Sequence, residues 1–208
     1  RLSYTNEANN RFETPLVNKN ETNVDNTITN MFKELTTNKN ILFVLSANLS
    51  IEEMQNVKNL ASKLNVDVSG YSPNTFDESF ADDYLRTNDR TANRAAFKEL
   101  QIDESKEYFD EKLNKASLVI IVENSYFENN ANLLENKKVI SLFSHHCMTI
   151  GYSNVAIPVA SFYEKSGTYI NINGIKQKVI SKMNKNNPMQ SITTVIEDLK
   201  SMIEKGTV

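Results

Sequence analysis

Three short stretches of the chain hold the residue types from which a chemical site could be built. The first is Ser46-Ala47-Asn48-Leu49-Ser50, which joins an apolar run to a helix-forming segment. Free N–H groups and the helix dipole at such a junction favour anionic ligands. The turn has no glycine that would let its backbone approach a pyrophosphate, and it lacks the lysine of a phosphate-binding loop. Ser46 and Asn48 are candidates for cofactor contact, although a plain connecting loop is the favoured interpretation.

The second stretch is His145-His146-Cys147, which contains the single cysteine and both histidines of the chain. These side chains are metal ligands by type, but adjacent residues do not readily share one tetrahedral centre, and no fourth ligand follows at the usual spacing. A Cys–His pair can also serve nucleophilic catalysis, although such partners normally meet across the fold. A loop with a buried thiol is the favoured interpretation, and a small metal-binding module is the alternative.

The third stretch places arginines at positions 86, 90 and 94, four residues apart. On one helix they would form a basic stripe able to hold carboxylate or phosphate groups. Three carboxylates lie among them, so local charge balance is the favoured explanation: Asp82, Asp83 and Asp89. No carboxylate pair stands out as an acid/base couple, and the residues by themselves demonstrate no catalysis.

A strand–helix–strand unit surrounds the first of these stretches. Residues 41–45 are a short apolar run of the kind buried on both faces of a sheet. Ser50 and Glu53 form a capping box, and apolar residues then recur at helical spacing as far as Leu64. A second short strand is predicted over 66–68. This order predicts a right-handed parallel crossover.

The remaining pattern extends this unit into an α/β domain. It predicts further strands at 117–122, 138–143 and 155–158, a helix beginning near Val24, a mostly helical stretch over 79–102 and a final helix over 190–205. Asn173-Gly174 lies between two alternating runs, which predicts a hairpin with a type I′ turn and a positive φ at both residues. We therefore expect an α/β fold: a parallel, Rossmann-like sheet flanked by helices, with a C-terminal β-hairpin and a terminal helix. We divide the chain into an irregular lead-in (1–27), the α/β domain (28–160) and a hairpin and C-terminal helix packed on that domain (161–208).

Length and composition exclude several classes of protein. The chain has 208 residues, of which 39% are hydrophobic and 24% charged, so it can form a core. No run approaches the roughly 18 apolar residues of a membrane helix. The net charge of −3 argues against a nucleic-acid binder, and one cysteine cannot form an internal disulfide or hold an iron–sulfur cluster. The chain begins at Arg1 without an initiator Met or a signal-peptide pattern, so we expect a piece of a longer protein.

Several segments, in the same order, resemble one family. They are residues 10–17 (N-R-F-E-T-P-L-V), residues 80–94 with Asp82-Asp83, Arg86 and Asn93-Arg94, and above all residues 155–169 (V-A-I-P-V-A-S-F-Y-E-K-S-G-T-Y), continuing through Asn171, Gly174 and Gln177. Together they are similar to the molybdopterin-oxidoreductase-like portion of the large, G-type subunit of bacterial NADH–quinone oxidoreductase (respiratory complex I). Asn154 and Ile175-Lys176 depart from the family pattern, which has Asp and Arg there.

The resemblance implies a non-catalytic scaffold domain that supports electron transfer from a reduced donor to quinone. It implies other subunits of the respiratory complex as partners, no nucleic acid, and a peripheral location on the cytoplasmic side of the bacterial inner membrane, reached through those partners. It implies no cofactor in this fragment and iron–sulfur clusters in a preceding N-terminal part. A pterin- or nucleotide-binding fragment of a formate dehydrogenase-like oxidoreductase is the alternative, and it adds Arg94, Thr168 and Asn171 to the cofactor-binding candidates. Whether the chain is itself an enzyme stays open.

Overall fold

The structure is a computed structural model that describes residues 10–84, 86–181 and 189–206. Over these residues, seven strands form one sheet in the order β2-β1-β7-β6-β5-β3-β4. The strands are β1 (Leu16–Val17), β2 (Asn20–Glu21), β3 (Ile41–Leu45), β4 (Asp67–Ser69), β5 (Leu118–Val122), β6 (Lys138–Phe143) and β7 (Val155–Pro158). β3 to β7 are parallel, and β1 joins β7 in the antiparallel sense. The predicted α/β fold is confirmed, because β3, β5 and β6 are parallel neighbours.

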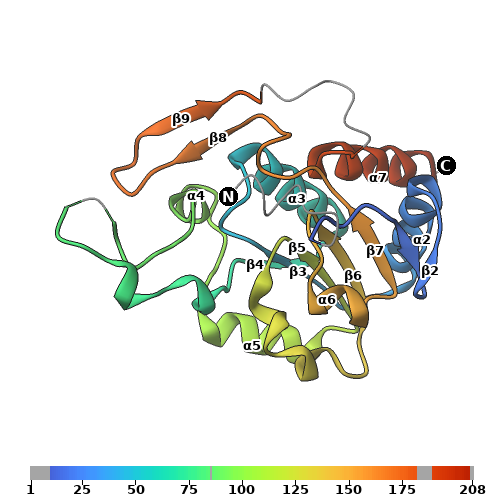
Figure 1. Cartoon of the computed structure of the whole chain (residues 1–208). Coiled ribbons are helices and arrows are strands. Elements are labelled where there is room, and N and C mark those ends of the chain that lie inside the picture. The colour runs from blue at the N-terminus through green and yellow to red at the C-terminus, as the bar shows by residue number, and fades with distance from the viewer. Residues whose placement is uncertain (1–9, 85, 182–188, 207–208) are drawn as a thin grey trace.

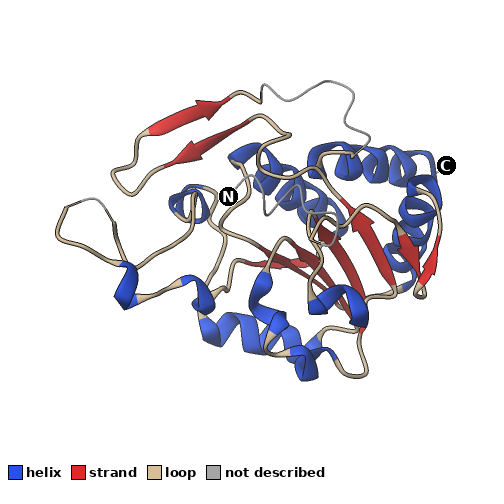
Figure 2. Ribbon diagram, viewed as in Figure 1, coloured by secondary structure: helices blue, strands red, loops and turns tan. Residues whose placement is uncertain are grey.

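Helices cover both faces of the sheet, as Figure 2 shows. α2 (Val24–Thr37), α3 (Ile51–Leu64) and α7 (Ile192–Gly206) lie on one face. α5 (Lys106–Lys115) and α6 (Met148–Tyr152) lie on the other. The short α4 (Ala95–Glu99) packs near the hairpin of β8 (Gly167–Ile170) and β9 (Lys176–Val179), as Figure 1 shows. Every residue of β3 and β5 is buried, which is the pattern expected of strands covered on both faces.

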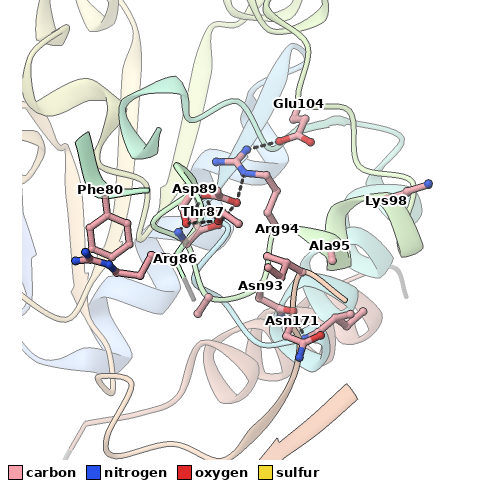
Figure 3. Close-up of a pocket in the computed structure, with 14 residues that line it drawn as sticks. Phe80, Arg86, Thr87, Asp89, Asn93, Arg94, Ala95, Lys98, Glu104 and Asn171 are labelled. Atoms are coloured by element: carbon pink, nitrogen blue, oxygen red, sulfur yellow. Dashed lines mark hydrogen bonds and ion pairs between the residues drawn. The ribbon is translucent and has the colours of Figure 1, made fainter. Parts of the chain in front are cut away.

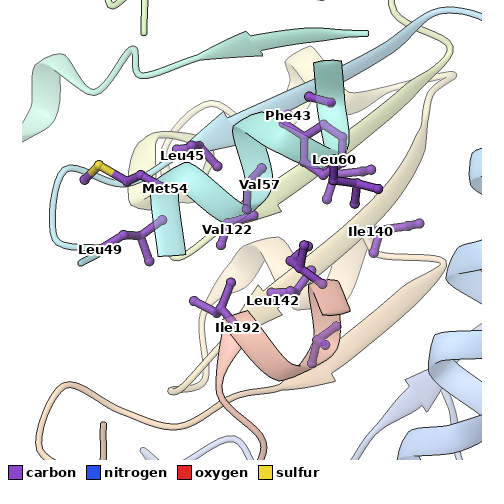
Figure 4. Packing of buried hydrophobic residues seen from close by; sticks show 14 of the residues in the cluster. Phe43, Leu45, Leu49, Met54, Val57, Leu60, Val122, Ile140, Leu142 and Ile192 are labelled. Atoms are coloured by element: carbon purple, nitrogen blue, oxygen red, sulfur yellow. The ribbon is translucent and has the colours of Figure 1, made fainter. Parts of the chain in front are cut away.

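The larger hydrophobic core lies between the sheet and α2, α3 and α7. Figure 4 shows Met54, Val57 and Leu60 of α3 beside Ile192 of α7, close to the side chains of the sheet. Burial of a Leu, Ile or Met side chain stabilises a fold by about 1.5–3 kcal/mol. The predicted capping box is present: Glu53 N donates to Ser50 Oγ at 3.2 Å, and Ser50 N donates to Glu53 Oε2 at 2.9 Å.

Two local predictions are wrong. Residues 79–102 are not mostly helical: short 3-10 turns at Pro73–Thr75 and Glu78–Phe80 lead through irregular backbone to α4. Aspartates compete with the helix here, since Asp77, Asp82 and Asp89 each accept a hydrogen bond from a backbone N–H two residues later. The basic stripe therefore does not exist as a helix face. The helix α5, in contrast, was not predicted.

The second correction concerns the hairpin of β8 (Gly167–Ile170) and β9 (Lys176–Val179), whose existence is confirmed. Its loop has five residues rather than a two-residue type I′ turn, because the last pair is Ile170 with Lys176. Gly174 has a positive φ of 77°, whereas Asn173 does not. The Asn171 side chain stabilises this longer loop, because its Oδ1 accepts hydrogen bonds from Asn173 N at 3.0 Å and Ile175 N at 2.9 Å.

Candidate functional site

A cleft of about 530 Å³ lies where irregular segments meet beyond the sheet. One wall is the segment between β4 and α4, and the other is formed by the end of β8 and the loop after it. Figure 3 shows the residues that line it, among them Asn93, Arg94, Ala95 and Asn171. The volume falls within the range of small-molecule sites in proteins, which is about 300–1,000 Å³. The cleft is therefore the candidate functional site.

Arg94 organises one wall of the cleft. Its Nε donates to Asp89 Oδ2 at 2.9 Å, and its Nη1 pairs with Glu104. Its Nη2 donates to Thr75 Oγ1 at 2.5 Å, and the guanidinium lies over the Phe76 ring, 4.3 Å from the centroid. These contacts engage all three nitrogens, so Arg94 fixes the wall rather than offering a free cation to a ligand.

Asn93 lies behind Arg94 and is completely buried. Its Nδ2 donates to Leu49 O at 2.7 Å, and its Oδ1 accepts from Ile170 N at 2.7 Å. Its backbone N–H donates to Ala47 O at 2.9 Å. One side chain thus joins the turn after β3 to the strand β8, and this sets the distance between the two walls.

The candidate residues of the turn after β3 are engaged by the protein itself. Ser46 Oγ accepts from Asn48 N at 3.1 Å, and Asn48 Oδ1 accepts from Ala92 N at 2.9 Å. The backbone N–H and hydroxyl of Thr168 both donate to Glu52, at 2.8 and 2.6 Å. Burial raises the pKa of the Glu52 carboxyl, but the bonds from Thr168 and other hydrogen bonds together lower it by more, so the net shift is downward.

The N-terminus of α3 is covered by the segment before β8. Lys165 Nζ pairs with both carboxylate oxygens of Glu53, at 2.8 and 2.9 Å, and Gly167 lies directly on Ser50. The position at which a parallel α/β fold commonly holds an anion is therefore occupied by the chain's own side chains. Of the five cofactor-binding candidates, Arg94 and Asn171 line the cleft, whereas Ser46, Asn48 and Thr168 are not among its lining residues.

His145, His146 and Cys147 each have a separate environment. The His145 ring packs edge-on against Phe143, and its Nδ1 lies 3.7 Å from Glu123 Oε2. The His146 ring packs against Phe12. Burial raises the pKa of the Cys147 thiol to about 11, so the thiol is not activated as a nucleophile. Within residues 10–84, 86–181 and 189–206, no three His, Cys, Asp or Glu side chains gather as a metal site would require.

Several cleft residues were not predicted from the sequence. In the sequence, Asn93 stands out only as part of a motif, and no pattern marks Ile170, Ile172 and Lys98 as residues of a site. A buried asparagine is recognisable as a structural group only when its backbone partners are known, and these lie 44 and 77 residues away. Phe80 and Arg86, at the left of Figure 3, form a stacked pair with 5.2 Å from the guanidinium carbon to the ring centroid.

The carboxylates of the cleft already have partners. Asp89 binds Arg94 and Thr91, and Glu104 binds Arg94. The Asn171 carbonyl oxygen is likewise used by its own loop. The fixed walls and the partnered carboxylates suit the cleft to binding, and this geometry contains no paired acid and base directed at a common point.

Comparisons with known proteins identify the fold. No family model matches the sequence, and the comparison with curated proteins found no relative. The structure is similar to a chain in the crystal structure of the formyltransferase/hydrolase complex (FhcABCD) from Methylorubrum extorquens, solved in complex with methylofuran. The TM-score is 0.52 at 9% sequence identity, and the match covers 93% of this chain and 100% of that chain.

These findings overturn the resemblance to the G-type subunit of NADH–quinone oxidoreductase. The motifs that carried it have structural roles here: Glu164 pairs with Arg11, Lys165 with Glu53, and Gly167 packs on Ser50. Short matches of this kind reflect packing rather than shared chemistry.

The functions drawn from that resemblance are wrong with it, both the respiratory scaffold domain and the formate dehydrogenase-like fragment. The naming of respiratory subunits as partners rested on that resemblance and loses its basis with it. The location at the bacterial inner membrane stays a prediction. The iron–sulfur clusters expected in a preceding part of the polypeptide stay a prediction. Across the described ranges, no helix is long and apolar enough to cross a membrane. What the comparisons establish is an α/β fold similar to that of a chain of the formyltransferase/hydrolase complex, over 93% of this chain.

Proposed function

We propose that this chain is a subunit of a multi-subunit complex of the formyltransferase/hydrolase kind and that it contributes binding surfaces rather than bond-making side chains. The observation that carries the proposal is the extent of the fold match, because it covers all of the similar chain in the formyltransferase/hydrolase complex and 93% of this chain. A match over a whole chain supports an equivalent unit of assembly better than a match over an isolated motif does.

The condition of the polar side chains supports a non-catalytic role. Arg94, Glu53 and Lys165 are each neutralised inside the fold. The Cys147 thiol has a raised pKa, which opposes nucleophilic use at neutral pH. Such groups hold loops in place, and fixed loops suit the recognition of a partner.

Native mass spectrometry of the full chain, purified with its associated proteins from its own cells at low salt, tests this proposal. We expect a hetero-oligomer of fixed stoichiometry in which at least one partner has formyltransferase or hydrolase activity. A monomer or homodimer at native concentration, with no stoichiometric partner, would contradict the proposal. So would partners that show neither activity.

A second candidate function is the binding of a small organic molecule in the cleft. The cleft's size and its apolar residues, Ile170 and Ile172 among them, favour it. Ile172→Asp would place a charge at the cleft, and Ile180→Asp is a matched control outside it, since the two isoleucines are 67% and 66% exposed. A fragment screen by ligand-observed NMR should yield a saturable ligand whose affinity falls at least tenfold in the first variant only. Equal loss in both variants, or no saturable ligand, would remove this candidate.

A further inference from the structure

The segment between β4 and α4 projects from the body of the protein, at the left of Figure 1. We call residues 72–84 and 86–94 the arm. Over these residues it contains only short 3-10 turns and irregular backbone. Connections in compact domains usually have about 4–6 residues, and ordered connections longer than about 12–15 residues usually serve a function. The arm therefore requires a functional explanation.

The arm is ordered by its own hydrogen bonds. Its two halves run antiparallel: Asp77 N donates to Asn88 O at 2.8 Å, and Arg90 N donates to Thr75 O at 3.0 Å. Nearer the tip, Asp82 N donates to Arg86 O at 2.9 Å. A loop already held in one conformation loses little further entropy when it binds a partner.

The arm exposes the residue types that dominate protein interfaces. Tyr84 near its tip is 90% exposed, and Phe76 is 46% exposed. Arg86 and Arg90 lie over the Phe80 ring, with 5.2 and 5.8 Å to the centroid. Tyrosine, phenylalanine and arginine are enriched in interface cores and among the residues that contribute most to binding. Stacking also holds the guanidiniums and rings in fixed positions.

The arm is acidic. The arm contains five carboxylates and three guanidiniums, which gives it a net charge of −2, whereas the whole chain has a net charge of −3. The carboxylates are Asp77, Glu78, Asp82, Asp83 and Asp89. Most of the excess negative charge of the chain is thus concentrated on a projecting, aromatic element. Such a field attracts a basic surface and repels phosphate groups.

We propose that the arm docks into a basic groove of a neighbouring protein subunit and that Tyr84 is its anchor in that groove. This inference rests on the proposed function, because it assigns the surface through which the chain assembles. A nucleic acid is disfavoured by the acidic charge, and a second copy of this chain would bring another net charge of −3.

Three variants of the full chain test the inference within the purified assembly. Tyr84→Ala removes the anchor. Asp83→Lys reverses one exposed charge of the arm. Tyr152→Ala is the matched control, since Tyr152 is 47% exposed on α6, away from the arm. Affinity for the remaining subunits and association rates at 50 and 500 mM NaCl are measured by surface plasmon resonance, and folding is checked by thermal unfolding.

We expect Tyr84→Ala to weaken binding at least tenfold, with thermal unfolding unchanged, because truncating an anchor at an interface usually costs that much. Asp83→Lys should slow association and reduce its dependence on salt. Tyr152→Ala should bind as the wild type does. If the wild type assembles and Tyr84→Ala binds equally well, the arm is not the interface, although the subunit proposal stands. If the wild type has no partner or forms only homodimers, the proposed function fails and this inference fails with it.

Discussion

Replacing Lys165 tests how the cleft is held together. Lys165 and Glu53 form a two-pronged ion pair at 2.8 and 2.9 Å, and their side chains are 7% and 3% exposed. The pair joins the segment before β8 to the first turn of α3. Lys165→Met removes the positive partner and leaves the Glu53 carboxylate buried, with one hydrogen bond from Ser50 N.

The expected cost follows from this burial. Removing one partner of a buried ion pair costs about 3–5 kcal/mol, because the remaining charge has no compensation. The free energy of unfolding of native proteins is about 5–15 kcal/mol, so this loss is a large share of the total stability. At a slope of about 2 kcal/mol per M of urea, the unfolding midpoint should fall by about 1.5–2.5 M.

A double variant separates charge from packing. Glu53→Gln retains a capping-box residue, so Glu53→Gln with Lys165→Met should recover at least about 2 kcal/mol relative to Lys165→Met alone. Lys178→Met on the exposed strand β9 is the control and should change stability by no more than about 0.5 kcal/mol. A cost below about 1 kcal/mol for Lys165→Met, or no recovery in the double variant, would refute the reasoning.

Three further predictions concern single groups. Burial raises the pKa of the Glu164 carboxyl, but hydrogen bonds from Ser161 and the charge of Arg11 lower it by more. The resulting stability is present above the unfolded-state pKa and is lost as the pH falls through the folded-state pKa. Glu164→Gln should therefore make the free energy of unfolding less dependent on pH at acidic pH, and an unchanged dependence would contradict this. The Cys147 thiol, with a pKa of about 11, should react with iodoacetamide at pH 8 roughly 100-fold more slowly than a free thiol and recover its full rate in urea; a native rate equal to that of glutathione would disprove its burial. A Cβ on Gly167 would lie 2.4 Å from the N-cap side chain of α3, so Gly167→Ala should cost about 1–3 kcal/mol, whereas Gly151→Ala meets nothing within 4 Å and should be neutral or stabilising in the same urea titration.

Much of the fold was predictable because its signals are local. β3 and β5 are apolar throughout, which only a strand covered on both faces requires. The capping box of Ser50 and Glu53 marks the start of α3 within four residues. The helical spacing of apolar residues likewise located α2 and α7.

The predicted local structure was wrong where polar side chains can bond to several alternative backbone groups. Arginines at helical spacing in 86–94 do not lie on a helix, because the neighbouring aspartates bind backbone N–H groups instead. The hairpin loop follows the Asn171 side chain rather than the preference of Asn173-Gly174. The residue pattern around Lys165 resembles that of the G-type subunit family, although the contacts show that these residues serve packing.

The sequence by itself determined the central strands, the helices α2, α3 and α7 and the acidic excess of residues 76–91, because each of these signals depends on neighbours along the chain. Only the tertiary structure decided the cleft and the projection of the arm. The cleft exists because Asn93 bonds to residues 44 and 77 positions away and because Glu53 meets Lys165 across 112 positions. Such long-range contacts form only when the core has brought the two segments together, so no local pattern of residues could specify them.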